Sequence, residues 1–93
     1  MSERDKAYIE RINDELRFIA KAMKNTSKAA FLADDVIQHA ISMSLLTIGE
    51  CANHLSEKFR EGHPQVEWIQ IIAVRNIVIN ILYRAENPQR AWF

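Results

Sequence analysis

The stretch from Val66 to about Tyr83 constrains the fold of this chain more than any other. Its sequence, WIQIIAVRNIVINILY, places apolar side chains at every angle around a helical wheel, so a helix formed here needs cover on all sides. A buried strand is the alternative, because positions 77–79 are β-branched, but no second strand-like run is available to pair with it. We therefore predict a helix from Val66 to about Tyr83.

Two further helical segments are predicted before this one. The first shows apolar residues at spacings of three and four, which indicates a helix of about six turns: Ile9, Ile12, Leu16, Ile19 and Met23. The second runs from Lys28 to Phe59, with a bend or a restart at the adjacent carboxylates Asp34 and Asp35. The glycine and proline of positions 62–64 then end it.

These segments predict one all-α domain, residues 1–93, folded as an antiparallel helical bundle. The 93 residues are too few for a second core, and only two glycines and two prolines interrupt the helices. Two neighbouring helices in so short a chain can cover only part of the third. We therefore expect its remaining face to meet a second copy of the chain, in a homodimer, or another partner.

Charge and cysteine content exclude several classes of function. Twelve Lys plus Arg balance twelve Asp plus Glu, so no net positive field attracts nucleic acid, and any RNA contact must be local. Cys51 is the single cysteine and no Cys/His spacing resembles a zinc site, so we expect no internal disulfide, metal or other cofactor. The charged opening lacks a secretory signal, and the longest uncharged stretch, positions 36–49, is shorter than a membrane span. A cytoplasmic protein outside the membrane is expected.

The predicted third helix carries one polar sector that is able to do chemistry. After Gln70 its polar residues fall within about 140° of a helical wheel. They are Arg75, Asn76, Asn80 and Tyr83. An arginine among isoleucines is costly unless it is paired with an anion or a hydrogen-bond acceptor. This sector is therefore the candidate site.

The partner of Arg75 stays open at this point. One interpretation is a structural ion pair with an acid of the second segment, Glu50, Asp34 or Asp35. The other is a phosphate-bearing ligand, which a guanidinium can bind through two donors. Gly49 in mid-helix costs about 1 kcal/mol relative to alanine, which indicates a close approach of two helices there.

Histidine and thiol chemistry are not expected elsewhere in the chain. His39 and His54 lie within the second segment and are expected to be ordinary surface or interface residues, whereas His63 belongs to the turn. Cys51 is expected to be a small packing residue, because no Lys, Arg or His flanks it in the sequence.

At these residues the chain resembles the HepT-like branch of the HEPN superfamily, the toxin half of bacterial MNT/HEPN toxin–antitoxin pairs. The resemblance runs through the leading helix, FLADD, LLTIGECANHLS, the turn-plus-tryptophan stretch HPQVEW, and VRNIVIN. Arg75 and Asn76 match the start of an R-x4-H motif, but so short a match is weakly specific by itself. The order and spacing of IGE, the proline and tryptophan turn and RN make the resemblance more specific.

The resemblance implies a metal-independent endoribonuclease that works as a homodimer, in which motif arginines and histidines of two protomers meet in a cleft. In such a cleft, histidine takes the proton of a ribose 2′-OH, which attacks the neighbouring phosphate, while arginine stabilises the added negative charge. Arg75 matches the family arginine and Asn76 its polar follower.

Two positions depart from the family pattern. Asn80 stands where the family has histidine, five residues after the arginine, and asparagine cannot act as a base at neutral pH. The family tyrosine, which the partner nucleotidyltransferase adenylylates, follows the histidine by two positions. Here the nearest tyrosine is Tyr83, three positions after Asn80, and this slip rotates it by about 100° around a helix.

Two functions follow from the resemblance and its departures. The first is a HepT-like ribonuclease toxin, weakened or inactivated by Asn80, with RNA as substrate and an MNT-type nucleotidyltransferase as antitoxin. The second is a non-enzymatic HEPN module that dimerises and binds a nucleotidyltransferase or an RNA. The sequence leaves both open.

Overall fold

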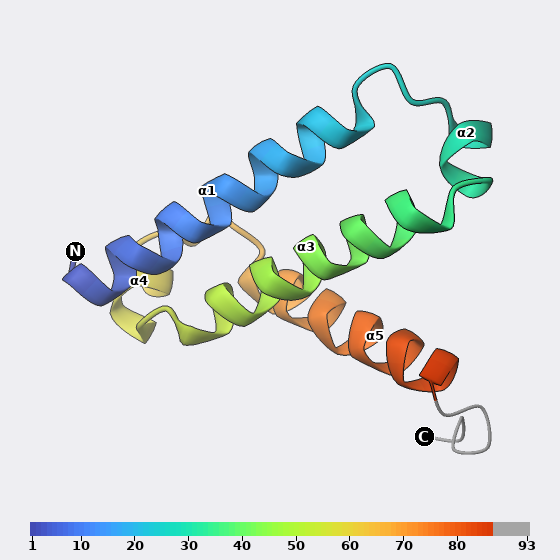
Figure 1. Ribbon diagram of the computed structural model, residues 1–93. Coiled ribbons are helices and arrows are strands. Elements are labelled where there is room, and N and C mark those ends of the chain that lie inside the picture. The colour runs from blue at the N-terminus through green and yellow to red at the C-terminus, as the bar shows by residue number, and fades with distance from the viewer. Residues whose placement is uncertain (87–93) are drawn as a thin grey trace.

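The computed structural model describes the backbone of residues 1–86 and the side chains of residues 1–80. This part forms helices α1 (Glu3–Met23), α2 (Lys28–Leu32), α3 (Asp35–His54), α4 (Glu57–Glu61) and α5 (Trp68–Glu86). α1 and α3 run antiparallel, short α2 joins them at one end, and α5 crosses α3 (Figure 1). None of the described residues lies in a strand, so the predicted all-α helical bundle is confirmed.

The predicted second segment, Lys28 to Phe59, consists of three helices. Its first break lies at the adjacent carboxylates, where Asp34 Oδ1 accepts two backbone N–H groups of the first turn of α3, at 3.0 and 3.1 Å. Its second break, at Ser56, was not predicted. The Ser56 hydroxyl accepts the backbone N–H of Phe59 at 3.1 Å and thereby caps α4.

α3 is the centre of the packing. Cys51 and Ala52 of α3 are buried, together with Leu55 at its C-terminal end and Val78 of α5. Enclosing a side chain the size of leucine stabilises a fold by about 2 kcal/mol. Because α1 and α5 both pack on α3, this helix fixes the positions of the other two.

α3 and α5 approach each other closely at Gly49. A Cβ atom at Gly49 would overlap the Cβ of Arg75 and would lie 3.1 Å from its Cγ and 3.3 Å from its Cα. The close helix approach predicted at this glycine is therefore found. It places the first atoms of the Arg75 side chain directly against the backbone of α3.

One face of α5 is left open. Ile69 exposes 82% and Ile77 57% of its surface, and Ala73 between them is also exposed. These three residues lie within about 80° of one another on a helical wheel, and we call them the open face of α5. For the described residues, the chain thus covers only part of this helix, as expected, whereas the homodimer stays a prediction. None of the described helices combines the length and the apolar character needed to cross a membrane.

Asp5 connects the start of α1 to the start of α4. Its carboxylate accepts the backbone N–H of Ser56 at 2.9 Å and the Ser56 hydroxyl at 2.7 Å, and Asp5 is buried. The hydrogen bonds from Ser56, the backbone one first, hold the pKa of Asp5 below its ordinary value of 3.8. No sequence spacing predicts this contact, because the two residues are 51 positions apart.

We expect Gly49→Ala to destabilise the protein. Alanine favours the helix by about 1 kcal/mol, but overpacking a close contact costs about 1 to 3 kcal/mol. Urea unfolding should therefore show a net loss of about 1 kcal/mol. Gly62→Ala is the matched control, because a Cβ there has its nearest neighbours at 3.4 Å and the residue has an ordinary φ of −72°. A Gly49→Ala protein as stable as the parent would contradict the close approach at Arg75.

We expect Asp5→Asn to lower the melting temperature at neutral pH, because an amide cannot replace the two charge-assisted bonds from Ser56. The folded-state pKa lies below 3.8, so this stabilisation is present above that pH and is lost as the pH falls below it. The melting temperatures of parent and variant should differ at neutral pH and converge in strong acid. Asp14→Asn, at a side chain that is 68% exposed, is the control and should change little at either pH. Equal melting temperatures for Asp5→Asn and parent at neutral pH would rule out this role.

Candidate functional site

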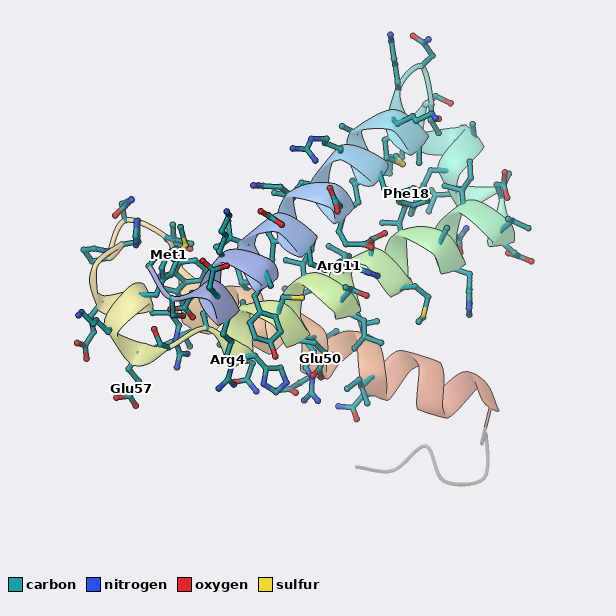
Figure 2. All side chains as sticks on the ribbon, turned by 60° about the vertical axis from the view of Figure 1, so that its left-hand side comes forward. Met1, Arg4, Arg11, Phe18, Glu50 and Glu57 are labelled. Carbon is teal, nitrogen blue, oxygen red and sulfur yellow. The ribbon has the colours of Figure 1, made fainter. Side chains whose placement is uncertain are left out.

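Polar side chains from three helices gather on one side of the molecule. We call this group the polar cluster. It consists of Arg4 and Tyr8 of α1, Glu50 and His54 of α3, and Arg75 and Asn76 of α5. Arg4 and Glu50 lie on the same side of the helices in Figure 2. The cluster therefore joins α3 to α5 by a hydrogen-bonded ion pair and α1 to α3 by ring stacking.

The centre of the polar cluster is the pair of Glu50 and Arg75. The Nε–H of Arg75 donates to Glu50 Oε1, and its Nη1 donates to Asn76 Oδ1 at 2.9 Å. These bonds use two of the five N–H donors of a guanidinium. The Arg75 side chain is 30% exposed, so solvent reaches part of it. Among the acids considered as its partner, Glu50 is the one that pairs with it, whereas Asp34 caps α3.

His54 shares Glu50 with Arg75. Its Nε2 lies 3.8 Å from Glu50 Oε2, which is an ion pair when the ring is protonated. The His54 ring stacks on Tyr8 with centroids 5.4 Å apart and planes at 14°. The Arg4 guanidinium lies 5.8 Å from the centre of the Tyr8 ring, a distance typical of a cation–π contact. His54 was expected to be an ordinary surface or interface residue, although its spacing of four from Glu50 puts both on one helix face.

The structure brings two of the four predicted site residues together. Arg75 and Asn76 are hydrogen-bonded to each other. Asn80 is exposed and lies about 7.5 Å further along α5 and about 140° around it from Arg75, by ideal helix geometry. The side chain of Tyr83, the predicted modification site, lies outside the described side chains.

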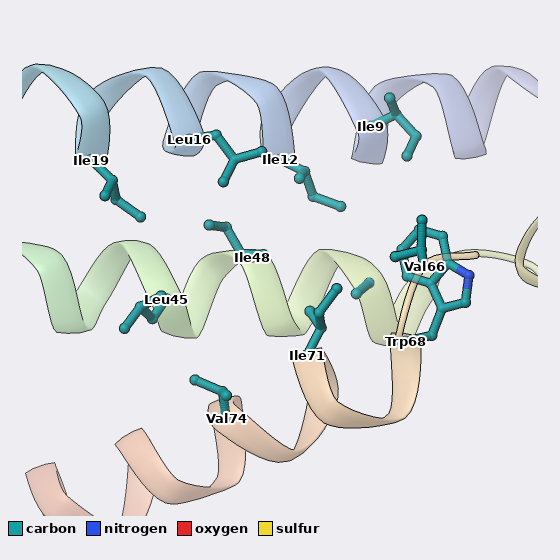
Figure 3. A pocket seen from close by; sticks show the side chains of 11 residues that line it. Ile9, Ile12, Leu16, Ile19, Leu45, Ile48, Val66, Trp68, Ile71 and Val74 are labelled. Atoms are coloured by element: carbon teal, nitrogen blue, oxygen red, sulfur yellow. The ribbon is translucent and has the colours of Figure 1, made fainter. Parts of the chain in front are cut away.

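An apolar groove of about 410 Å³ lies between α1, α3 and α5. Side chains of these three helices and of the segment before α5 point into it, among them Ile12, Ile48, Ile71 and Val74 (Figure 3). Trp68 also lines it, and its indole N–H donates to the backbone oxygen of His63 at 3.1 Å. With so apolar a lining, the groove suits hydrophobic packing and offers no group for acid–base chemistry.

Cys51 is buried on α3 as a packing residue. Its burial raises the pKa of the thiol, which disfavours the reactive thiolate. Within residues 1–80, no three His, Cys, Asp or Glu side chains are grouped so that they could hold a metal ion.

The sequence is similar to known proteins over most of its length. A family model described as Ribonuclease HepT-like matches residues 12–92. A candidate RNase of Caldanaerobacter subterraneus subsp. tengcongensis is 36% identical over 73 residues, which cover 78% of this chain and 65% of that protein. The chain thus spans just under two thirds of the length of this relative.

Two further proteins are also similar. A candidate RNase of Methanocaldococcus jannaschii is 31% identical over 81 residues, which cover 86% of this chain and 74% of that protein. A probable ribonuclease HepT of Thermococcus cleftensis is 25% identical over 83 residues, covering 89% of this chain and 76% of that protein. No solved structure matches the chain.

Proposed function

The chain belongs to the HepT-like ribonuclease family, and we propose that it is the toxin component of a bacterial toxin–antitoxin pair, a metal-independent endoribonuclease of weakened activity. RNA is its proposed substrate, and an MNT-type nucleotidyltransferase is its proposed antitoxin. The names of three relatives support the choice of RNA, because each contains RNase or ribonuclease.

The anchored guanidinium of Arg75 is the observation that carries the proposal. Glu50 holds its Nε and Asn76 its Nη1, so the planar group is fixed in orientation while its side chain stays 30% exposed. A fixed guanidinium binds phosphate oxygens through paired donors and stabilises the extra negative charge of a phosphoryl transition state. This is the local cation that a chain without net charge needs for RNA contact.

Asn80 is the reason for proposing weak activity. The resemblance implies a histidine at this position that accepts the proton of the ribose 2′-OH. An amide has no basic nitrogen, so this contribution of about two to four orders of magnitude is missing. Arg75 and substrate positioning then remain as sources of rate enhancement.

The open face of α5 supports the homodimer. Asn80 lies on the same side of the helical wheel as Ile69, Ala73 and Ile77, within about 80°. A second copy packed on this face would bury the isoleucines, and each Å² of buried apolar surface contributes about 25 cal/mol. It would also place two copies of Asn80, the motif position that lies on this side of α5, at the interface.

A non-enzymatic HEPN module is the second candidate function. Two observations favour it: Arg75 already has an internal partner in Glu50, and Asn80 cannot act as a base. Such a protein would keep the dimer and bind the nucleotidyltransferase or an RNA without cleaving it. Modification of Tyr83 by the nucleotidyltransferase belongs to either function and stays a proposal.

Light scattering tests the dimer. The parent chain should have about twice the monomer mass of 10.8 kDa, and Ile77→Glu should be a folded monomer, because the dimer would bury an unpaired charge. Val36→Glu is the matched control, since Val36 is 77% exposed but lies at the start of α3, away from the proposed interface. Val78→Glu would not be a suitable test of the dimer, because Val78 is buried within the chain. A monodisperse parent monomer at micromolar concentration would refute the dimer.

Restoring the histidine tests the ribonuclease. We expect Asn80→His to cleave RNA about 100-fold faster than the parent or more, because it supplies the missing base. The cleavage should resist chelators and leave 2′,3′-cyclic phosphate ends. Adding Arg75→Ala should abolish it.

Two results would decide against this function. A folded and dimeric Asn80→His protein that stays inert would leave the non-enzymatic module as the function. An Arg75→Ala protein that loses stability but binds RNA as tightly as the parent would show that Arg75 serves the fold alone.

A further inference from the structure

We propose that His54 is the proton acceptor in the weak RNA cleavage of this chain, the role that Asn80 cannot fill. This inference rests on the proposed ribonuclease function and assigns a further catalytic residue to the same site. It is carried by Glu50, whose carboxylate contacts both the imidazole of His54 and the guanidinium of Arg75.

The shared carboxylate places a base next to a phosphate-binding group. Oε1 of Glu50 accepts from Arg75, and Oε2 lies 3.8 Å from Nε2 of His54. Two groups on the two oxygens of one carboxylate are close enough to contact a single nucleotide, whose 2′-OH and 3′-phosphate are neighbours. The His54 side chain is 49% exposed, so a bound strand can reach its ring.

Glu50 lies beside one of the two ring nitrogens of His54. Its Oε2 is 3.8 Å from Nε2, which is too long for a direct hydrogen bond, and Nδ1 is the nitrogen that we assign as the proton acceptor. When Nδ1 takes a proton, the ring becomes positive and the contact with Glu50 becomes an ion pair. In the proposed step Glu50 is thus the negative group nearest to the charge that develops on the ring.

The surroundings of His54 hold the ring in place. Its face stacks on Tyr8 of α1, 5.4 Å away between centroids, and Tyr8 in turn lies against Arg4. Of the charged groups in the polar cluster, Glu50 lies beside the ring, Arg4 contacts Tyr8, and Arg75 contacts Glu50. Tyr8 of α1 and Glu50 of α3 thus hold the ring at the edge of the polar cluster.

The other two histidines do not share this arrangement. His39 lies eleven positions before Glu50 on α3, which is about 16 Å along the helix. His63 follows α4, where its Nδ1 contacts the backbone oxygen of Phe59 at 2.9 Å and its ring stacks on the ring of the same residue. His54 is therefore the histidine that contacts a partner of Arg75.

The proposed step is an internal transesterification. Nδ1 of His54 takes the proton of the ribose 2′-OH, and the 2′-oxygen forms a bond to the adjacent phosphorus. The bond from phosphorus to the 5′-oxygen of the next nucleotide breaks, and that oxygen receives the proton back through water. The products are a 2′,3′-cyclic phosphate and a 5′-OH. Arg75 stabilises the negative charge that the phosphate oxygens carry in the transition state.

The test compares residual cleavage of a short RNA by the parent protein, His54→Ala and His39→Ala. We expect His54→Ala to lose about 100-fold or more, to the uncatalysed background, and added imidazole to restore part of the loss. His39→Ala, an exposed histidine of the same helix, should cleave like the parent. Circular dichroism establishes that each variant is folded, and His54→Gln, which keeps a polar side chain, should show the same loss.

The double variant Asn80→His, His54→Ala separates this inference from the function on which it rests. It should retain the fast cleavage of Asn80→His, because the motif position then supplies the base. Residual parent cleavage that is unchanged in a folded His54→Ala protein would overturn the role of His54, and so would a failure of imidazole to rescue it. A parent without measurable cleavage would overturn it as well. Inactivity of Asn80→His would instead count against the proposed function.

Discussion

The contact between α3 and α5 at Gly49 is the constraint on which the rest of the structure depends. Because no side chain separates the helices there, the stem of Arg75 packs against the α3 backbone and its head reaches Glu50, the next residue of α3. A partly buried guanidinium is stable only when it is paired. The glycine that lets the helices approach therefore also makes the neighbouring carboxylate necessary, and it fixes the arginine at the same point.

The features of the fold that could be predicted from the sequence are those that depend on a local pattern or on the energy of a single residue. Helical periodicity predicted the α-helical segments, and the cost of a mid-helix glycine predicted the close approach at Gly49. The cost of an unpaired arginine predicted that Arg75 needs a partner, but left Glu50 as one of several candidates. The break at Ser56 escaped prediction because its partner, Asp5, lies 51 positions away. The surroundings of His54 were not predicted, because a helical wheel shows which face of a helix a residue occupies but not which neighbouring helix packs against that face.

The apolar sequence of α5 is explained by three different neighbourhoods around one helix. Val78 is buried within the chain, Ile71 and Val74 line the groove shared with α1, and Ile69 and Ile77 lie on the open face. A helix with one buried face would need apolar residues over only part of its circumference. The all-round pattern therefore reflects two apolar surfaces besides the core, the groove and the open face. The described part of the chain covers the groove side in part and leaves the open face to solvent.

In the proposed function, the pairing of Arg75 with Glu50 determines how the polar cluster recognises phosphate. A neutral pair in a chain without net charge exerts little attraction beyond about 10 Å, so recognition depends on the donors that Arg75 keeps and on their fixed geometry. During the proposed reaction the phosphate gains negative charge while the ring of His54 becomes positive. Glu50 then faces two cations instead of one, and its charge stabilises the new imidazolium while the remaining donors of Arg75 meet the phosphate. In the proposed reaction, one carboxylate thus couples proton transfer to His54 with stabilisation of the phosphate by Arg75. Both cations must contact Glu50 for this coupling.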